Sequence, residues 1–189
     1  MPILYSAVNR FDPTSGETWQ GYINWSGLTQ LREVISLDGI LCPSMFQELT
    51  DEDWEFNVQE DFKTHLFFNL DHVLKKLVGE ERVNVLALME SPAAEDVASF
   101  ADPRFAFRGF DLVEVHGTIS ALVNCGGFDM AFSNAELSEF GLITEYQRAF
   151  DIQQALREHY PDEPHADCGV WAIWQMIEEL EAVRQRRDS

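Results

Sequence analysis

Cys168 is the residue whose type and position best suit chemistry, because a cysteine thiolate is a strong nucleophile. It follows Asp167, a good helix N-cap, and the apolar residues beyond it recur at helical spacing. A helix N-terminus lowers the pKa of a thiol, and the nearby imidazole of His165 would lower it further. The sequence therefore offers Cys168 as a nucleophile, although free cysteines are often small buried core residues, which is the interpretation we favour.

The string Asp167-Cys168-Gly169-Val170 resembles the nucleophile segment of the SUMO-protease and adenovirus-protease type of cysteine peptidase. The resemblance covers four residues of the chain. It implies an upstream histidine followed by an acid, and His116 and Asp129 would take these roles. It also implies a glutamine ahead of the cysteine for the oxyanion hole, whereas residues 160–164 (YPDEP) contain none.

The other cysteines favour a structural interpretation. Cys125 precedes two glycines, which suits a core cysteine beside a tight turn, and Cys42 precedes a proline. Structural zinc sites pair cysteines about two to four residues apart, a spacing that Cys42, Cys125 and Cys168 lack. We therefore expect no metal, no cofactor and three reduced thiols.

The net charge is strongly negative. The chain carries 33 Asp and Glu against 13 Lys and Arg in 189 residues, a formal net charge of −20. Such a charge argues against direct binding of nucleic acid or anionic lipid, because those surfaces are recognised by Lys and Arg. It attracts basic partners instead.

The charge is concentrated between Arg32 and Lys63, where no basic residue occurs. Part of this stretch interleaves acids with aromatic residues, and an interface needs apolar anchors as well as charge. The candidate partner-binding residues are Asp51, Glu52, Asp53, Trp54, Glu55, Phe56, Glu60 and Asp61. The alternative interpretation is a solvated acidic surface without a partner.

Composition predicts one folded α+β domain over residues 1–189. The hydrophobic fraction is 46% and the aromatic fraction 12%, too high for a disordered acidic tail. No apolar run approaches the ~20 residues of a membrane span, and no secretory signal is visible at the N-terminus. We therefore expect a cytoplasmic protein.

The elements predicted to position these residues form a central antiparallel or mixed sheet flanked by several helices. Strands are expected at residues 3–8, 22–25, 83–89, 107–115 and 118–124, and helices near residues 28–35, 45–49, 66–77, 134–140 and 145–160, with a further helix that starts at Pro92. The last element expected is a long amphipathic helix from Asp167, with an apolar stripe that includes Val170, Trp174 and Leu180. Arg184, Arg186 and Arg187 would lie at its C-terminal end.

Three functions are compatible with these patterns. The first is a non-catalytic acidic binding protein, such as an inhibitor or immunity-type partner of a basic protein. The second is a cysteine-dependent hydrolase that uses Cys168 with His165 and His116. The third is an acidic assembly protein.

Overall fold

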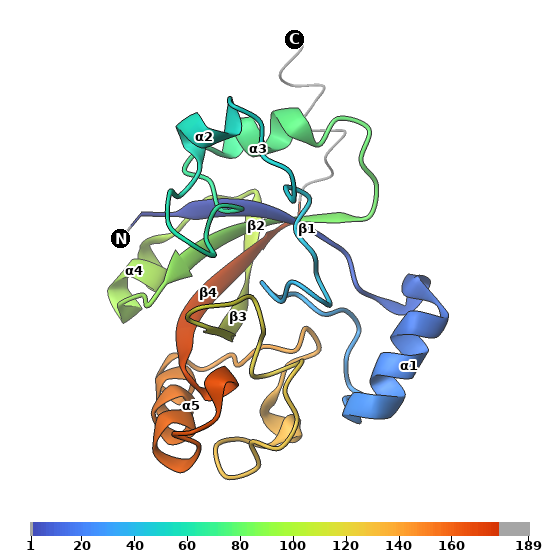
Figure 1. Ribbon diagram of the computed structural model, residues 1–189, viewed down its shortest axis with the longest axis vertical. Coiled ribbons are helices and arrows are strands. Elements are labelled where there is room, and N and C mark those ends of the chain that lie inside the picture. Colours follow the sequence, from blue (N-terminus) through green and yellow to red (C-terminus); the bar gives the residue numbers. More distant parts are fainter. Residues whose placement is uncertain (1, 178–189) are drawn as a thin grey trace.

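The computed structural model describes residues 2–177, and its centre is a four-stranded antiparallel sheet with the order β1-β2-β4-β3 (Figure 1). The strands are β1 (Leu4–Asn9), β2 (Val83–Glu90), β3 (Phe105–Glu114) and β4 (Cys168–Met176). Each neighbouring pair is antiparallel. Together with the helices, this sheet confirms the α+β class.

Helices and 3₁₀ turns fill the connections between the strands. The helices are α1 (Glu17–Ser26), α2 (Asp53–Phe56), α3 (Leu70–Lys76), α4 (Ala94–Ser99) and α5 (Tyr146–His159). The 3₁₀ turns are η1 (Pro13–Ser15), η2 (Asn134–Glu136) and η3 (Pro164–Ala166). No helix within residues 2–177 combines the length and apolar character needed to cross a membrane.

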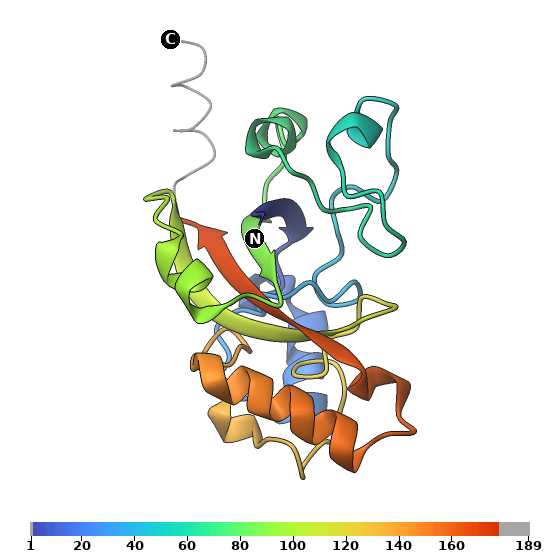
Figure 2. The same ribbon diagram turned by 90° about the vertical axis from the view of Figure 1, so that its left-hand side faces the viewer.

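Helices cover both faces of the sheet. Helices α3 and α5 lie on opposite sides of it in both views (Figures 1 and 2). Helix α5 places Ala149, Ile152 and Leu156 in the core, a spacing that puts them on one helical face. A strand covered on both faces is apolar at successive positions, and residues 84–89 of β2 are all buried. The strand expected at residues 83–89 is therefore confirmed.

Loop segments cover parts of both outer edges of the sheet. On β1, the backbone of Tyr5 exchanges hydrogen bonds of 2.7 and 2.8 Å with Phe67, and Asn9 N–H donates to the carbonyl of Pro43. On β3, the backbone of Phe110 exchanges bonds of 2.7 and 3.0 Å with Ile143. These contacts satisfy backbone groups that an edge strand otherwise leaves open.

The long C-terminal helix is a wrong prediction for every residue of it that the structure describes. Residues 168–176 form β4, which lies between β2 and β3. Its residues from Val170 to Trp174 are all buried, because helices lie on both faces of the sheet. A continuous apolar run has apolar residues at helical spacing as well as at strand spacing. Periodicity alone therefore does not distinguish a buried strand from a helix here. Leu180 and the cluster Arg184, Arg186 and Arg187 lie outside the described residues.

Four further expectations are wrong, because local turns and side-chain hydrogen bonds determine the backbone at these positions. Residues 22–25 belong to helix α1, and residues 28–35 and 45–49 form turns instead of helices. Residues 118–124 form turns next to β3 with a single bridge, between Val113 and Ser120. There the Ser120 hydroxyl donates to Asp111 and its N–H donates to Asp38, so these side-chain bonds take the place of a strand ladder.

The helix expected at residues 134–140 is reduced to the three-residue 3₁₀ turn η2, whereas other elements agree with expectation apart from their ends. The helix expected at residues 66–77 is shortened to α3, and the strand at residues 107–115 is β3. The capping box expected at Ser133 and Glu136 is present with both of its hydrogen bonds, at the start of η2.

Candidate partner-binding surface

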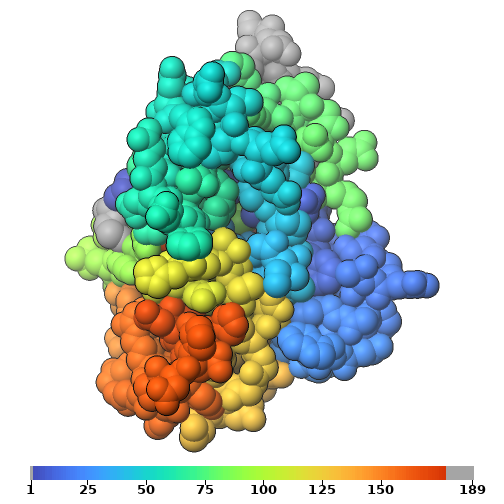
Figure 3. Space-filling view, viewed as in Figure 1, coloured from blue at the N-terminus to red at the C-terminus, as the bar shows by residue number. Residues whose placement is uncertain are grey.

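Residues 50–69, which we call the acidic loop, form an ordered layer beside β1 and carry helix α2. Two backbone hydrogen bonds join its halves, from Val58 to Leu66 at 2.7 Å and from Phe68 to Phe56 at 2.9 Å. The Tyr5–Phe67 pair then fixes the loop to the sheet. In the space-filling view the loop lies on the visible face, directly beside the turn that follows β3 (Figure 3). The acidic residues are therefore displayed on a fixed surface.

Asp53 is an exception among the predicted binding residues, because it lies in the interior. Its carboxylate accepts hydrogen bonds from the Lys76 ammonium at 2.6 Å and from the N–H and hydroxyl of Thr50, and it lies 2.7 Å from His72 Nε2. Burial raises the pKa of Asp53, but the hydrogen bonds from Lys76, Thr50 and His72 outweigh it and hold the pKa well below its usual value. Asp53 therefore anchors α2 onto α3 and is not a contact residue for a partner.

The acids around Asp53 lie on the surface. Exposed are Asp51, Glu52, Glu55, Glu60 and Asp61. Two of them form ion pairs, Glu52 with Lys75 at 2.8 Å and Glu60 with Lys63 at 3.0 Å. Asp51, Glu55 and Asp61 have no ion pair with any residue between 2 and 177.

Aromatic side chains accompany these acids. Trp54, Phe62 and Phe68 are 46%, 53% and 54% exposed. Phe56 is half-buried, and its ring lies 4.8 Å from the ring of His72, so it packs the acidic loop against helix α3. The sequence pattern identified Trp54 as an anchor but did not include Phe62 and Phe68, which lie after the last acid of the run.

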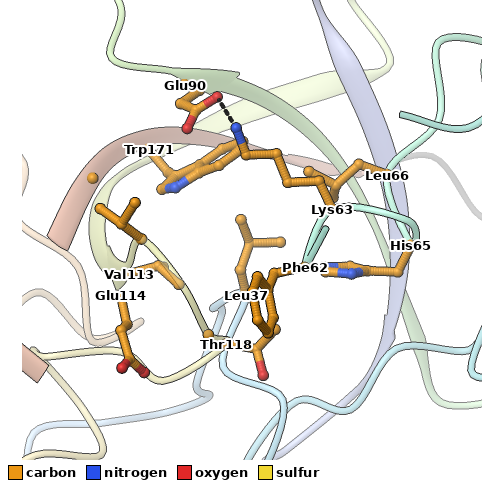
Figure 4. A pocket seen from close by; sticks show the side chains of 13 residues that line it. Leu37, Phe62, Lys63, His65, Leu66, Glu90, Val113, Glu114, Thr118 and Trp171 are labelled. Carbon is orange, nitrogen blue, oxygen red and sulfur yellow. Dashed lines mark hydrogen bonds and ion pairs between the residues drawn. The ribbon is translucent and has the colours of Figure 1, made fainter. Parts of the chain in front are cut away.

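A small cavity opens between the acidic loop and the turn after β3 (Figure 4). We call it the Trp171 cavity; it has a volume of about 30 Å³. Trp171 and Phe62 form two of its walls, and Lys63 and Glu114 lie at opposite ends (Figure 4). The Lys63 ammonium pairs with Glu90 at 2.9 Å and lies 6.0 Å from the centre of the Trp171 ring.

Glu114 is the least satisfied charged group of this cavity. Its side chain is only 18% exposed, and no N–H or O–H group in the described part of the chain donates a hydrogen bond to it. Its nearest charged neighbour is His165, whose Nδ1 is 3.5 Å from Glu114 Oε2 and has no hydrogen-bond partner there either. Gly117 packs against the carboxylate so closely that a Cβ at this position would collide with it.

A second cavity, of about 300 Å³, adjoins the first and shares Leu37, His65 and Thr118 with it. The His65 ring forms part of the boundary between the two cavities. Burial lowers the pKa of His65, so its imidazole is neutral at physiological pH.

The surroundings of Cys168 differ from the sequence expectation. Cys168 begins strand β4 instead of a helix, and it is fully buried. Its thiol donates a hydrogen bond to the backbone carbonyl of His165 at 2.9 Å, and burial raises its pKa well above the ordinary value. The burial confirms the favoured interpretation of Cys168 as a core cysteine, and the lowering of the thiol pKa expected for a nucleophile at a helix N-terminus is wrong.

The imidazoles assigned to Cys168 have other contacts. The His165 ring is oriented towards Glu114, and the His116 ring packs against Phe62 with 6.4 Å between ring centres. Asp129 is exposed in the turn after Gly127.

The other two cysteines have structural positions. Cys42 is buried and its thiol donates a hydrogen bond to the carbonyl of Val34, whereas Cys125 is half-buried. All three cysteines are free. Residues 2–177 contain no group of His, Cys, Asp or Glu side chains arranged to hold a metal ion.

A buried carboxylate network supports the turn beside the Trp171 cavity, and no local sequence pattern predicts it. The Asp111 carboxylate is completely buried and accepts hydrogen bonds from the hydroxyls of Ser36 and Ser120, both at 2.6 Å. Burial raises the pKa of Asp111 to about 6. Asp38, also buried, accepts bonds from Ser120 N–H and from the Asn124 side chain.

Comparison of the chain with protein-family models, with curated proteins and with solved structures finds no match.

Proposed function

We propose that this chain is a non-catalytic binding protein that recognises a basic protein through the acidic loop. The observation that carries the proposal is the combination of exposed acids with three half-exposed aromatic rings on one fixed segment. Protein interfaces draw most of their binding energy from a few aromatic anchors, and complementary charge supplies attraction and specificity.

The charge of the loop supports a basic partner. The loop has six acids, of which Asp53 is internal, and one base, Lys63. Lys63 is already paired with Glu60 and Glu90, so it does not offset Asp51, Glu55 and Asp61. A net charge of −20 on the whole chain adds long-range attraction for a cationic protein.

The internal position of Asp53 also supports the proposal. Its contacts with Thr50, His72 and Lys76 hold α2 in place. Trp54 and Glu55, which belong to α2, are therefore already ordered before a partner binds. A preorganised surface loses less conformational entropy when the complex forms.

The experiment is capture of partners from the native host at low salt, with identification of each captured protein. The test variant combines Asp51→Asn, Glu52→Gln and Glu55→Gln. The control combines Asp151→Asn, Glu158→Gln and Asp162→Asn, which makes the same charge change on exposed residues of α5 and the turn after it. We expect capture of a basic protein by wild type and by the control, and slower association with a weaker salt dependence for the test variant. Equal capture by all three proteins would refute the proposal.

The cysteine hydrolase receives no support from the described residues, because the Cys168 thiol is buried and forms no hydrogen bond with the imidazole of His165 or of His116. The acidic assembly protein is a weaker alternative, since no observation specifies what it would assemble. The proposed compartment is the cytoplasm, in keeping with three free cysteines.

A further inference from the structure

We propose that the Trp171 cavity receives an arginine side chain of the basic partner, whose guanidinium pairs with Glu114 and lies against Trp171 and Phe62. This inference rests on the proposed function and specifies the side chain that the binding surface recognises.

Glu114 is a carboxylate without a protein donor. Its side chain is largely removed from water, its oxygens are not fully closed off from solvent, and no N–H or O–H group of residues 2–177 donates a hydrogen bond to it. A guanidinium offers five N–H donors in a planar fork that matches a carboxylate. A cationic side chain entering the cavity therefore supplies what Glu114 lacks.

The second argument is that the cavity already accommodates one cation. The ammonium of Lys63 lies over the Trp171 ring and on the Glu90 carboxylate at one end. Aromatic faces attract cations through their quadrupole, so the wall that faces Lys63 is suited to a positive charge. The other end, at Glu114, has the carboxylate but no ammonium or guanidinium, and its nearest charged neighbour is the His165 imidazole, 3.5 Å away (Figure 4).

The third argument is the shape of the entrance. Phe62 has φ of +65°, a left-handed conformation that is strained for a bulky residue, and its ring is 53% exposed beside the cavity. Strained backbone of this kind clusters at binding and catalytic sites, where the surrounding structure maintains it. Here it holds an aromatic ring against the turn that carries His116.

The size of the cavity favours a side-chain head over a larger ligand. A volume of about 30 Å³ corresponds to roughly two water molecules on the scale at which one water needs about 10–15 Å³. Arginine fits better than lysine, because its flat guanidinium stacks on aromatic rings and binds a carboxylate at two points. Since Phe62 and Lys63 belong to the acidic loop, a partner docked on the loop reaches the cavity directly.

The test uses the short peptide acetyl-Gly-Arg-Gly-amide, with citrulline and lysine in place of arginine as probes of charge and of shape. The dissociation constant is measured by NMR from the indole N–H resonance of Trp171, assigned with Trp171→Phe. We expect the arginine peptide to shift this resonance with saturation, the lysine peptide to bind more weakly, and the citrulline peptide not to bind.

Two variants locate the site. Glu114→Gln should weaken arginine-peptide binding by about tenfold, the effect of losing a charge-assisted hydrogen bond. Phe62→Leu should also weaken it, while Asp167→Asn, an exposed acid outside the cavity near the same turn, should leave it unchanged. Amide spectra of the variants confirm that each is folded.

The outcomes separate this inference from the proposed function. Equal binding of the citrulline peptide, or equal weakening by Glu114→Gln and Asp167→Asn, would overturn the arginine site. Absence of arginine-peptide binding, with capture of a basic partner still dependent on Asp51, Glu52 and Glu55, would refute the inference and leave the proposed function intact. Saturable binding that depends on Glu114, without loop-dependent capture, would support the arginine site and refute the docking role of the loop.

Discussion

The Lys76 ammonium lies 2.6 Å from the Asp53 carboxylate and joins helix α3 to helix α2, beside the contacts of His72 with Asp53 and of Lys75 with Glu52. Helix α2 has only four residues and α3 has seven, both too short to be stable alone. The position of α2 in the acidic loop therefore depends on its contacts with α3, and the interior charge of Asp53 lies at their centre.

Asp53→Asn should lower the free energy of unfolding by about 2 kcal/mol or more, because it removes the carboxylate of an internal ion pair and leaves the Lys76 ammonium without its partner. Urea unfolding measures the change. Glu52→Gln is a matched control, since Glu52 also pairs with a lysine of α3, but at the surface, where such pairs contribute about 0–1 kcal/mol. Equal losses for the two variants would contradict the anchoring role of Asp53.

Trp54→Ala should leave the protein folded, with a loss of stability of about 1 kcal/mol or less, because the side chain is 46% exposed. If Trp54 is a central anchor, the same change should weaken partner binding by about 2 kcal/mol, mainly through faster dissociation. Surface plasmon resonance with the captured partner measures this. Trp25→Ala is the control, because Trp25 is 61% exposed and lies outside the acidic loop; a similar loss of binding for Trp25→Ala would remove the argument for an anchor at Trp54.

Acidification from about pH 7.5 to about pH 5.5 should stabilise the fold by about 1 kcal/mol through Asp111. The pKa of this group is raised to about 6 in the folded protein, above its ordinary value of 3.8. Its stabilisation is thus complete below the unfolded value and is lost as pH rises through about 6. Thermal melts across this range measure the effect, and Asp111→Asn should flatten it; an unchanged slope in the variant would assign the effect to other groups.

The carboxylates with a lowered pKa affect stability over a different pH range from Asp111. Asp53, Asp102 and Glu136 all have pKa values held down in the folded state. They therefore contribute stability above their unfolded values and lose it only as pH falls below about 4. Stability is expected to decline again in that acid range, which separates their effect from that of Asp111.

Cys168 should react slowly with iodoacetamide at neutral pH, because the buried thiol has a raised pKa and little thiolate. Cys125, which is half-buried, should be modified first. Mass spectrometry of the alkylated peptides gives the order. Fast and selective modification of Cys168 would return the hydrolase to consideration.

The strands with one clear local signal could be predicted from the sequence, and those that depend on neighbours could not. Residues 83–90 were identifiable as β2 because a short β-branched apolar run between turns has no good helical alternative. Residues 168–176 have the same buried character, but they follow an N-cap-like Asp167 and include Val170, Ile173 and Trp174 at helical spacing. Their strand conformation is determined by pairing with β2 and β3, which are distant in sequence.

The binding surface could be predicted in part for a similar reason. An alternation of acids and aromatics identifies residues 51–61 as unusual, but it does not show which side chains face inward. Asp53 is interior because His72 and Lys76 from α3 meet it, and nothing in the local pattern distinguishes it from Asp51 or Glu55. The partners of Trp171 in its cavity, Phe62 and Glu114, come from two other segments, so only the folded chain brings them together.

The loops that border the sheet affect how copies of this protein behave when they are crowded. The backbone groups that Tyr5, Asn9 and Phe110 use to bond with Phe67, Pro43 and Ile143 are not available for pairing with a strand of another molecule. An open edge is the usual template for growth of intermolecular sheets, and like charges on the two molecules oppose such contact further. At these positions another molecule can contact only side chains, because the backbone groups are already bonded within the chain.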